Sequence, residues 1–120
     1  METNEITEKI IGCAFRVINS LGAGFLEKVY ENALFHELKK ENLFVQQQHP
    51  IEVKYDGIVV GEYTVDLLVE NEILVELKAV KELDKVHEAQ CINYLKATGF
   101  RICLLINFGK PKIEINRIML

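Results

Sequence analysis

The chain has 120 residues and a mass of 13.8 kDa, which suits one domain with a real hydrophobic core. Its hydrophobic content of 49% and mean hydropathy of +0.09 exclude a disordered chain, and no apolar run is long enough to cross a bilayer. The net charge of −4 argues against indiscriminate coating of nucleic acid but leaves room for a local basic groove.

The first residues and the cysteines predict a cytoplasmic protein. Met1–Glu5 is polar and acidic, whereas a secretory signal begins basic and then turns apolar. The cysteines, Cys13, Cys91 and Cys103, are widely spaced, form no Cys-x-x-Cys pair and lie in apolar surroundings. We therefore expect reduced core cysteines and no zinc site.

The first forty residues predict two helices. Apolar residues recur at helical spacing over 4–20, where Asn4 or Thr7 caps the start and the glycines of Leu21–Gly24 end the helix. A second helix is predicted from Phe25 to Glu41. The glycines between them do not form a dinucleotide-binding loop, because they follow a helix and lack a third glycine.

From Val45 onward the pattern becomes that of strands. Val45–Tyr55 alternates apolar and polar residues as far as Asp56-Gly57, a dipeptide typical of a hairpin turn, and Ile58–Val69 is the returning strand. Ile73–Val80 is apolar at nearly every position, as expected of a central strand that is covered on both faces.

The rest of the chain predicts one helix and two strands. The helix is Asp84–Thr98, capped by its first residue and stopped by Gly99, and the strands are Arg101–Asn107 and Lys112–Ile118. The order α-α-β-β-β-α-β-β predicts a single α/β (α+β) domain over residues 1–120, with a central mixed sheet flanked by helices.

The hairpin between the second and third predicted strands brings two acids together. Counting outward from a turn centred on Asn71 places Asp66 opposite Glu76, with Cβ atoms about 5 Å apart. Lys78 follows Glu76 by two residues and shares its face. A bulge in the hairpin would shift this register by one residue, so the pairing is a hypothesis.

Two adjacent carboxylates inside apolar strands need a compensating charge. Their repulsion of roughly 3 kcal/mol at an effective dielectric constant near 20 adds to the cost of desolvation. Lys78 neutralises only one of the two charges, and oxygen ligands at a strand end suit Mg²⁺ or Mn²⁺. The alternative is a salt-bridged trio in which Lys78 pairs with one acid and the cluster only orders the sheet.

Three more side chains are candidates for the same site. Gln90 and Tyr94 share one stripe of the third predicted helix with His87, although a core tyrosine beside a solvated histidine and glutamine fits the same spacing. Glu27 lies on an inward face of the second predicted helix. It either joins the acids as a third carboxylate or simply favours the helix N-terminus through the dipole.

Taken together, these motifs resemble the GxxExxY proteins, small prokaryotic members of the PD-(D/E)XK nuclease superfamily. The resemblance runs from about Ile6 to Ile118 and rests on the order of five segments: Gly24-Phe-Leu-Glu27-Lys-Val-Tyr30-Glu31, Gly61-Glu-Tyr-Thr-Val-Asp66, Glu76-Leu-Lys78, Gln90-x-x-x-Tyr94 and Leu105-Ile-Asn107-Phe-Gly109. The fourth segment is similar to the helix motif of the recombination-exonuclease branch. Val65 stands where the name-giving proline would be, a departure shared by many members.

The resemblance implies a restriction-endonuclease-like αβββαβ core and a metal-dependent nuclease. Asp66 and Glu76 would then bind Mg²⁺ or Mn²⁺, and Glu27 would complete the metal site. Lys78 would orient or deprotonate the attacking water and stabilise the charge on the phosphorane. The last two implied site residues, Gln90 and Tyr94, would position their helix and contact the substrate strand or the site.

We therefore expect a phosphodiesterase that acts on nucleic acid, with DNA preferred over RNA as the expected substrate, and that binds no membrane. Five basic residues are candidates for holding the substrate, or else belong to an ordinary solvated surface: Lys78, Lys81, Lys85, Lys96 and Arg101. So short a chain predicts weak sequence specificity, or a homodimer or protein partner that supplies further contacts.

Two rival interpretations remain open. A non-catalytic module that binds nucleic acid or protein would keep the fold and its acids, and the net charge of −4 favours it slightly. A small-molecule phosphoesterase or other hydrolase would need an enclosed pocket, and the sequence contains no phosphate-binding loop or nucleophile motif.

Overall fold

The computed structural model describes residues 1–120 and contains the predicted elements in the predicted order. Its helices are α1 (Thr3–Leu21), α2 (Glu27–Lys40) and α3 (Lys85–Thr98). Its strands are β1 (Val45–Tyr55), β2 (Ile58–Val69), β3 (Ile73–Lys78), β4 (Ile102–Asn107) and β5 (Glu114–Met119). None of the helices has the length and apolar character needed to span a membrane.

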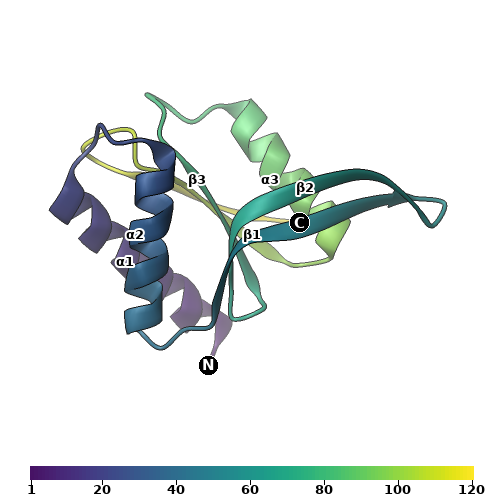
Figure 1. Cartoon of the computed structure of the whole chain (residues 1–120), viewed down its shortest axis with the longest axis horizontal. Helices are drawn as coiled ribbons and strands as arrows, with labels where there is room; N and C mark the ends of the chain where they lie inside the picture. The colour runs from purple at the N-terminus through teal and green to yellow at the C-terminus, as the bar shows by residue number, and fades with distance from the viewer.

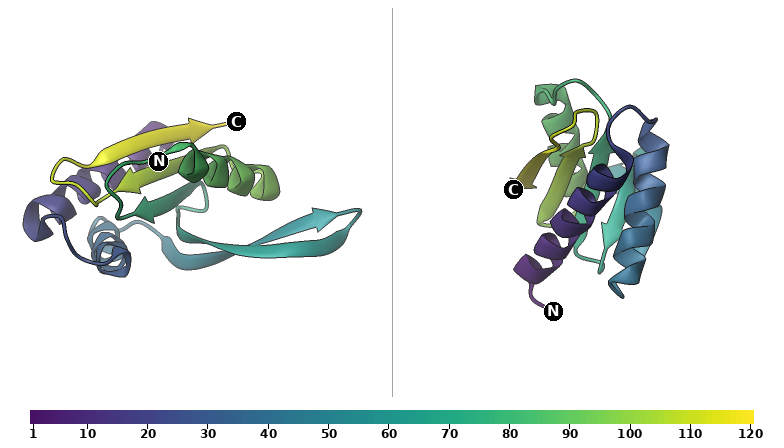
Figure 2. Two further views of the ribbon diagram at one scale, coloured as in Figure 1. Left: turned by 90° about the horizontal axis from the view of Figure 1, so that it is seen from above. Right: turned by 90° about the vertical axis from the view of Figure 1, so that its left-hand side faces the viewer.

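The five strands form one mixed sheet in the order β1-β2-β3-β4-β5. β3 and β4 run parallel and are joined by α3, whereas the other neighbouring strands are antiparallel. α1 and α2 lie on one face of the sheet and α3 on the other (Figure 2). The expected α+β class, a mixed sheet flanked by helices, is thus confirmed, and the β1–β2 hairpin extends beyond the sheet as a long arm (Figure 1).

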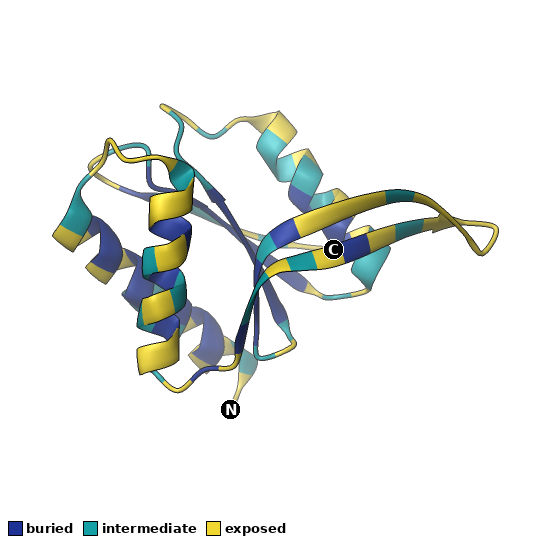
Figure 3. Cartoon of the chain, in the orientation of Figure 1, coloured by how far each residue is buried: buried dark blue, intermediate teal, exposed yellow.

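Two apolar clusters hold these layers together. The larger has 21 buried residues and joins α1 and α2 to alternate residues of the central strands, such as Val75 and Leu104. The smaller has nine and joins α3 to the intervening residues, such as Leu74 and Leu105. β3 is therefore covered on both faces, as predicted, and the strands at the centre of Figure 3 are buried. The three cysteines are free and buried, also as predicted.

Several local signals in the sequence act as predicted. Asp84 caps α3, because its carboxylate accepts the Val86 N–H while the His87 ring accepts the Asp84 N–H. Gly99 ends the same helix with a left-handed φ of 80°. The turn Asp56–Gly57 has φ values of 51° and 77°, the two positive values that a type I′ hairpin turn requires.

The predicted cap of the first helix is wrong. The helix begins at Thr3, and its N-cap Glu2 makes no side-chain capping bond. The Thr7 hydroxyl donates to the Asn4 carbonyl oxygen within the helix, and the Asn4 side chain accepts from Arg117 of β5. A tertiary contact thus occupies one of the expected capping groups. The other predicted ends differ from the structure by at most two residues.

β2 changes the face it presents to α3 at Asp66. After Asp66, the even-numbered Leu68 packs in the cluster under α3. Before Asp66, the odd-numbered Val65 packs in that same cluster. A regular strand would place these two residues on opposite faces. The ladder between β1 and β2 is interrupted at the same level, where Gln48 has a left-handed φ of 51°. The β1–β2 arm therefore leaves the sheet at Asp66, one of the two predicted acids.

Candidate active site

Asp66 and Glu76 lie where β2 and β3 separate. The ladder between these strands ends at the pair Leu67–Val75, which confirms the predicted register. Beyond it, each carboxylate accepts a backbone N–H of the opposite strand. The Asp66 N–H donates to Glu76 Oε1 at 3.1 Å, and the Leu77 N–H donates to Asp66 Oδ2 at 2.8 Å. These two bonds replace the ladder and keep the two acids side by side.

The carboxyl groups of this pair are poorly solvated. Glu76 is 5% exposed and Asp66 is half-buried. Burial and the neighbouring charge of Asp66 raise the pKa of Glu76 to about 8. Burial also raises the pKa of Asp66, although the Leu77 N–H opposes this shift. In the metal-free protein the pair therefore retains a proton at neutral pH.

Lys78 supplies a positive charge beside the pair. Its Nζ lies 3.8 Å from Glu76 Oε2, and its side chain is 17% exposed. This separation allows an ion pair but is too long for an ordinary hydrogen bond. One ammonium group offsets only one carboxylate, so without a cation the other acid must keep its proton. β3 thus carries Glu76 and Lys78 of the predicted trio, and β2 carries Asp66.

The structure adds two residues that sequence reasoning missed, Glu31 of α2 and Gln48 of β1. Gln48 Nε2 donates to Glu31 Oε1 at 3.0 Å and to Asp66 Oδ1 at 3.2 Å, while its Oε1 accepts from the Thr64 hydroxyl at 3.0 Å. Glu31 is 3% exposed and pairs with Lys28 Nζ at 3.0 Å. This network holds Oδ1 of Asp66, the oxygen that the Leu77 bond leaves free.

The sequence contained a signal for only one of these residues. Glu31 is an acid directly after Tyr30 on the inward side of the second helix, where a charged residue needs a partner. Gln48 lies in a run of three glutamines that looks uniform in the sequence. Its contact with Asp66 occurs at its left-handed backbone conformation, which only the folded chain reveals.

Tyr30 fixes the connection that leads into α2. Its ring is fully buried and stacks on Phe108 with centroids 5.0 Å apart. Its hydroxyl donates to the Gly22 carbonyl oxygen at 2.6 Å and accepts the Phe25 N–H at 3.1 Å. These contacts position the first turn of α2, where Glu27 lies.

Glu27 is the first residue of α2. Burial and then the charge of Asp66 raise its pKa, while Lys78 and His87 oppose that shift. However, no three side chains of the His, Cys, Asp or Glu type lie close enough together to hold a metal ion. The role of Glu27 as a third ligand therefore stays a prediction, and so does its alternative role at the helix dipole.

Gln90 and Tyr94 form a hydrogen-bonded pair on α3. Gln90 Nε2 donates to Tyr94 Oη at 2.8 Å, and Tyr94 is 4% exposed. Burial and then the charges of Glu76 and Asp66 raise the pKa of Tyr94, which packs in the smaller cluster with Val65 and Leu74. His87, on the same stripe, is not simply solvated, because it caps α3 as described above.

The predicted basic residues are distributed unevenly around this site. Lys78 lies beside the acids, Lys81 and Lys85 are exposed at the start of α3, and Lys96 is exposed near its end. Arg101 precedes β4 at the end of the sheet remote from Lys78, about 20 Å away at 3.3 Å per strand residue. The structure therefore does not bring Arg101 to the acids.

The donor set fits a hard divalent cation. Asp66 and Glu76 offer carboxylate oxygens, which Mg²⁺ and Mn²⁺ prefer, and Mg²⁺ is often held by one or two carboxylates with water in its remaining positions. A cation between the two acids would keep both ionised and would remove the repulsion that raises the pKa of Glu76.

Two solved structures are similar to this chain. The crystal structure of SSO0001 is similar to this chain with a TM-score of 0.57 and 18% identity, over 78% of this chain and 50% of that chain. An alkaline exonuclease (LHK-Exo) from Laribacter hongkongensis has a TM-score of 0.48 and 14% identity, over 77% of this chain and 55% of that chain. The chain thus spans about half the length of these solved structures.

Among the curated proteins, none matches the sequence. The likeness to SSO0001 shows a shared fold. A family model described as the PD-(D/E)XK nuclease superfamily matches residues 4–118, which is nearly the whole chain and includes the acid pair, Lys78, Gln90 and Tyr94. The GxxExxY branch within it stays a prediction. The protein therefore belongs to the PD-(D/E)XK nuclease superfamily.

Proposed function

We propose that the protein is a divalent-metal-dependent nuclease that hydrolyses phosphodiester bonds of nucleic acid, with DNA as the preferred substrate. The observation that carries this proposal is the poorly solvated pair of Asp66 and Glu76, with Lys78 Nζ 3.8 Å from Glu76 Oε2. Membership of the superfamily supports the same chemistry. In a purely structural trio, Lys78 offsets one acid and the other keeps a proton at neutral pH, whereas a bound cation would allow both acids to ionise.

In this proposal Asp66 and Glu76 hold Mg²⁺ or Mn²⁺, and Glu27 joins them once its side chain turns toward the pair. The bound cation supplies Lewis-acid activation of the phosphate and a lowered pKa for a bound water. Lys78 orients or deprotonates that water and stabilises the negative charge that develops on the phosphate oxygens. The water oxygen would form the new bond to phosphorus as the P–O bond to the leaving sugar oxygen breaks, and that oxygen would take up a proton from solvent water.

The surrounding residues keep this arrangement in place. Gln48 and the Leu77 N–H hold one oxygen each of Asp66, which restricts the direction from which a cation approaches. Gln90 holds the Tyr94 hydroxyl beside the acids, where it can contact the substrate strand. Since the pair retains a proton at neutral pH, cation binding releases that proton and becomes stronger as the pH rises.

Cation binding is tested by thermal melts with and without Mg²⁺ or Mn²⁺. A cation present at 100 times its Kd should stabilise the protein by about 2.7 kcal/mol. The variant Asp66→Asn should lose this response, whereas Glu8→Gln should keep it, because Glu8 is exposed on α1 at the other face of the sheet. No shift with either ion at millimolar concentration would favour the non-catalytic binding module.

Hydrolysis is tested with labelled DNA and RNA, single- and double-stranded, in the presence of Mn²⁺. The wild type should cleave DNA, and Lys78→Ala should cleave none while its melting temperature still responds to the cation. Lys39→Ala is the control, because this lysine is exposed on α2, at the other face of the sheet. If Lys78→Ala cleaves DNA as fast as the wild type, the activity comes from a contaminant or the assigned role is wrong.

A further inference from the structure

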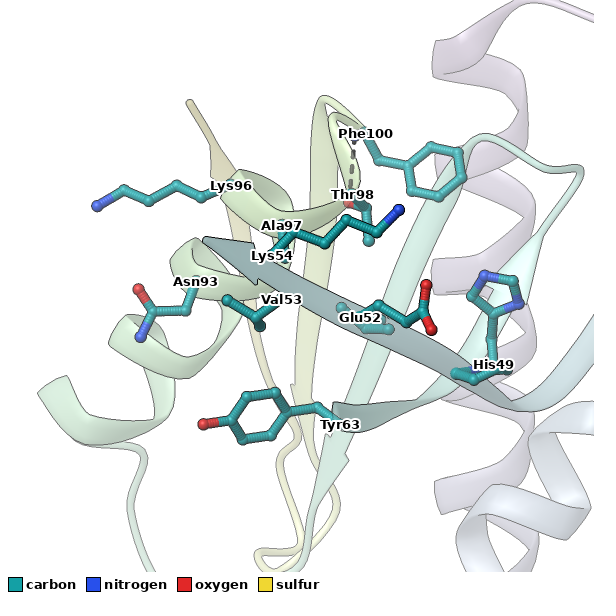
Figure 4. A pocket seen from close by; sticks show the side chains of 12 residues that line it. His49, Glu52, Val53, Lys54, Tyr63, Asn93, Lys96, Ala97, Thr98 and Phe100 are labelled. Atoms are coloured by element: carbon teal, nitrogen blue, oxygen red, sulfur yellow. Dashed lines mark hydrogen bonds between the residues drawn. The ribbon is translucent and has the colours of Figure 1, made fainter. Parts of the chain in front are cut away.

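Outside the acid pair, a groove of about 790 Å³ separates β1 from the C-terminal half of α3 (Figure 4). One wall is the continuous run His49–Lys54 of β1, with Tyr63 of β2 beside it. The other wall consists of the last turns of α3, including Asn93 and Lys96, and of Phe100 just beyond the helix. We call this feature the β1–α3 groove.

The β1–α3 groove continues toward the acids. A second hollow of about 320 Å³ adjoins it and shares Tyr63 and Asn93 with it, and Gln90 and Tyr94 line the second hollow. The rings of Tyr63 and Tyr94 lie 5.9 Å apart. Tyr94 packs in the smaller cluster with Val65, the residue before Asp66, so a nucleic-acid chain lying in the groove would run toward the acid pair.

The side chains of the β1–α3 groove offer one kind of chemistry. Lys54 and Lys96 are exposed on opposite walls, and Glu52 is the acid among the lining residues, so the groove is locally positive in a chain of net charge −4. Tyr63 is 54% exposed and presents its ring between the walls, with the Asn93 amide nearby. Lysines that contact phosphates and an aromatic ring that stacks on a base are the usual means of holding a single nucleic-acid strand.

We propose that the β1–α3 groove binds single-stranded nucleic acid, with a base stacked on Tyr63 and phosphates held by Lys54 and Lys96. The inference rests on the proposed function and narrows its substrate to a single strand or the frayed end of a duplex. An intact duplex is excluded from this mode, because its bases stack on one another and leave no open face for Tyr63.

A peptide strand is the other occupant that an edge strand such as β1 accepts. β1 is poorly suited to it. Pro50 lacks an N–H, the register shifts between Val53 and Lys54, and Glu52 adds a charge on the same edge strand. These are features by which edge strands avoid pairing with a further strand, so the nucleic-acid strand is the occupant that the groove favours.

The test is the binding of a labelled single-stranded oligodeoxythymidine, followed by fluorescence anisotropy with Ca²⁺ in place of a catalytic cation. The double variant Lys54→Glu/Lys96→Glu should raise the Kd about tenfold or more. The control Lys9→Glu/Lys39→Glu makes the same charge change on α1 and α2, at the other face of the sheet, and should change the Kd much less.

Stacking is tested by two substitutions at one position. Tyr63→Ala should raise the Kd about tenfold, whereas Tyr63→Phe keeps the ring and should bind as the wild type does. A circular dichroism melt of each variant checks that it is folded. The wild type should also prefer the single strand to a blunt duplex of the same length.

The outcomes separate the groove from the chemistry. If the groove variants bind single strands as tightly as the control, or the wild type shows no preference for them, the groove is left to a peptide segment and the inference is overturned. If the wild type cleaves DNA with Mn²⁺ but the groove variants bind single strands with an unchanged Kd, the groove assignment is wrong and the proposed hydrolysis still holds. If the groove variants lose single-strand binding but neither the wild type nor any variant cleaves DNA, the proposed hydrolysis is wrong and the groove assignment still holds.

Discussion

The two faces of the sheet differ in what they contain. The face under α1 and α2 carries a continuous apolar cluster of 21 buried residues, whereas the face under α3 buries nine and also carries Glu76, Lys78 and the β1–α3 groove. Burial of apolar area on the first face supplies most of the stabilisation. The fold therefore tolerates the repulsion of two acids on the other side.

β3 contributes residues both to the larger apolar cluster and to the face that carries the acids. The odd-numbered residues of β3, from Ile73 to Leu77, belong to the larger cluster, while Leu74 belongs to the smaller one and is followed on its face by the acid and the lysine. Because successive side chains of a strand point to opposite faces, six residues serve both the core and the candidate site. The main core and the candidate site are therefore separated across the sheet rather than along the chain.

Equal substitutions on the two faces should have unequal costs, and this is the largest expected effect. Leu34→Ala removes a fully buried side chain from the larger cluster and should cost about 4 kcal/mol of unfolding free energy. Leu95→Ala, equally buried under α3, should cost about 2 kcal/mol, because the smaller cluster beside the groove relaxes into the space. Urea unfolding measures both. Equal costs would remove the distinction between the faces.

The pH dependence of stability should come from the α3 face. Since the pKa of Glu76 is raised from 4.5 to about 8, the folded protein keeps a proton that the unfolded chain releases within this range. The stability that this proton contributes is fully present below pH 4.5 and is lost as the pH rises through 8. In EDTA, the melting temperature should therefore fall by several degrees from mildly acidic to mildly alkaline pH.

Glu76→Gln is the variant that isolates this effect, because its amide imitates the protonated acid. It should flatten the pH profile of the metal-free protein, whereas Glu8→Gln on the opposite face should leave the slope unchanged. A melting temperature that rises with pH in both the wild type and Glu76→Gln would mean that other groups dominate.

Gln48 connects the two faces, because it bridges Glu31 of α2 and Asp66. We expect Gln48→Ala to weaken cation binding about tenfold by releasing one oxygen of Asp66. Mn²⁺ titrations followed by the melting temperature measure this change. Gln47→Ala is the matched control, because Gln47 also donates to Glu31 but makes no bond to Asp66. Equal affinities for the two variants would show that the bridge does not position the acid.

The smallest expected effect is at the polar end of the α1–α2 layer. Tyr30→Phe removes the hydroxyl bonds to Gly22 and Phe25 while keeping the stacked ring, and should cost about 1 kcal/mol of stability. Tyr55→Phe is the control on the exposed arm, at 70% exposure, and should cost nothing measurable in the same urea titration. A Tyr30→Phe protein as stable as the wild type would assign the role of Tyr30 to its ring alone.

Much of the site was predictable because it depends on local rules. The register that places Asp66 opposite Glu76 follows from a short turn and period-two alternation, and the structure confirms it. Lys78 follows from the same alternation. Gln90 and Tyr94 follow from helical spacing, and the structure shows them hydrogen-bonded to each other.

Other features were not predictable from spacing. The change of face at Asp66 and the bridging role of Gln48 coincide with an interrupted ladder, and alternation assumes a regular one. The contribution of Lys54 to a groove depends on how β1 approaches α3, and this is a distance between elements far apart in the chain. Arg101 was grouped with the site by its nearness in sequence, but β4 places it at the other end of the sheet.

The sequence alone determined the elements, their order and the class of the fold, because hydrophobic periodicity, caps and turn residues act within a few residues of one another. It also determined which acids share a hairpin. Only the tertiary structure decided how α2 and β1 hold Asp66 and where a groove opens beside α3. These features depend on how helices and strands pack against each other, and that packing is a property of the whole core rather than of any one segment.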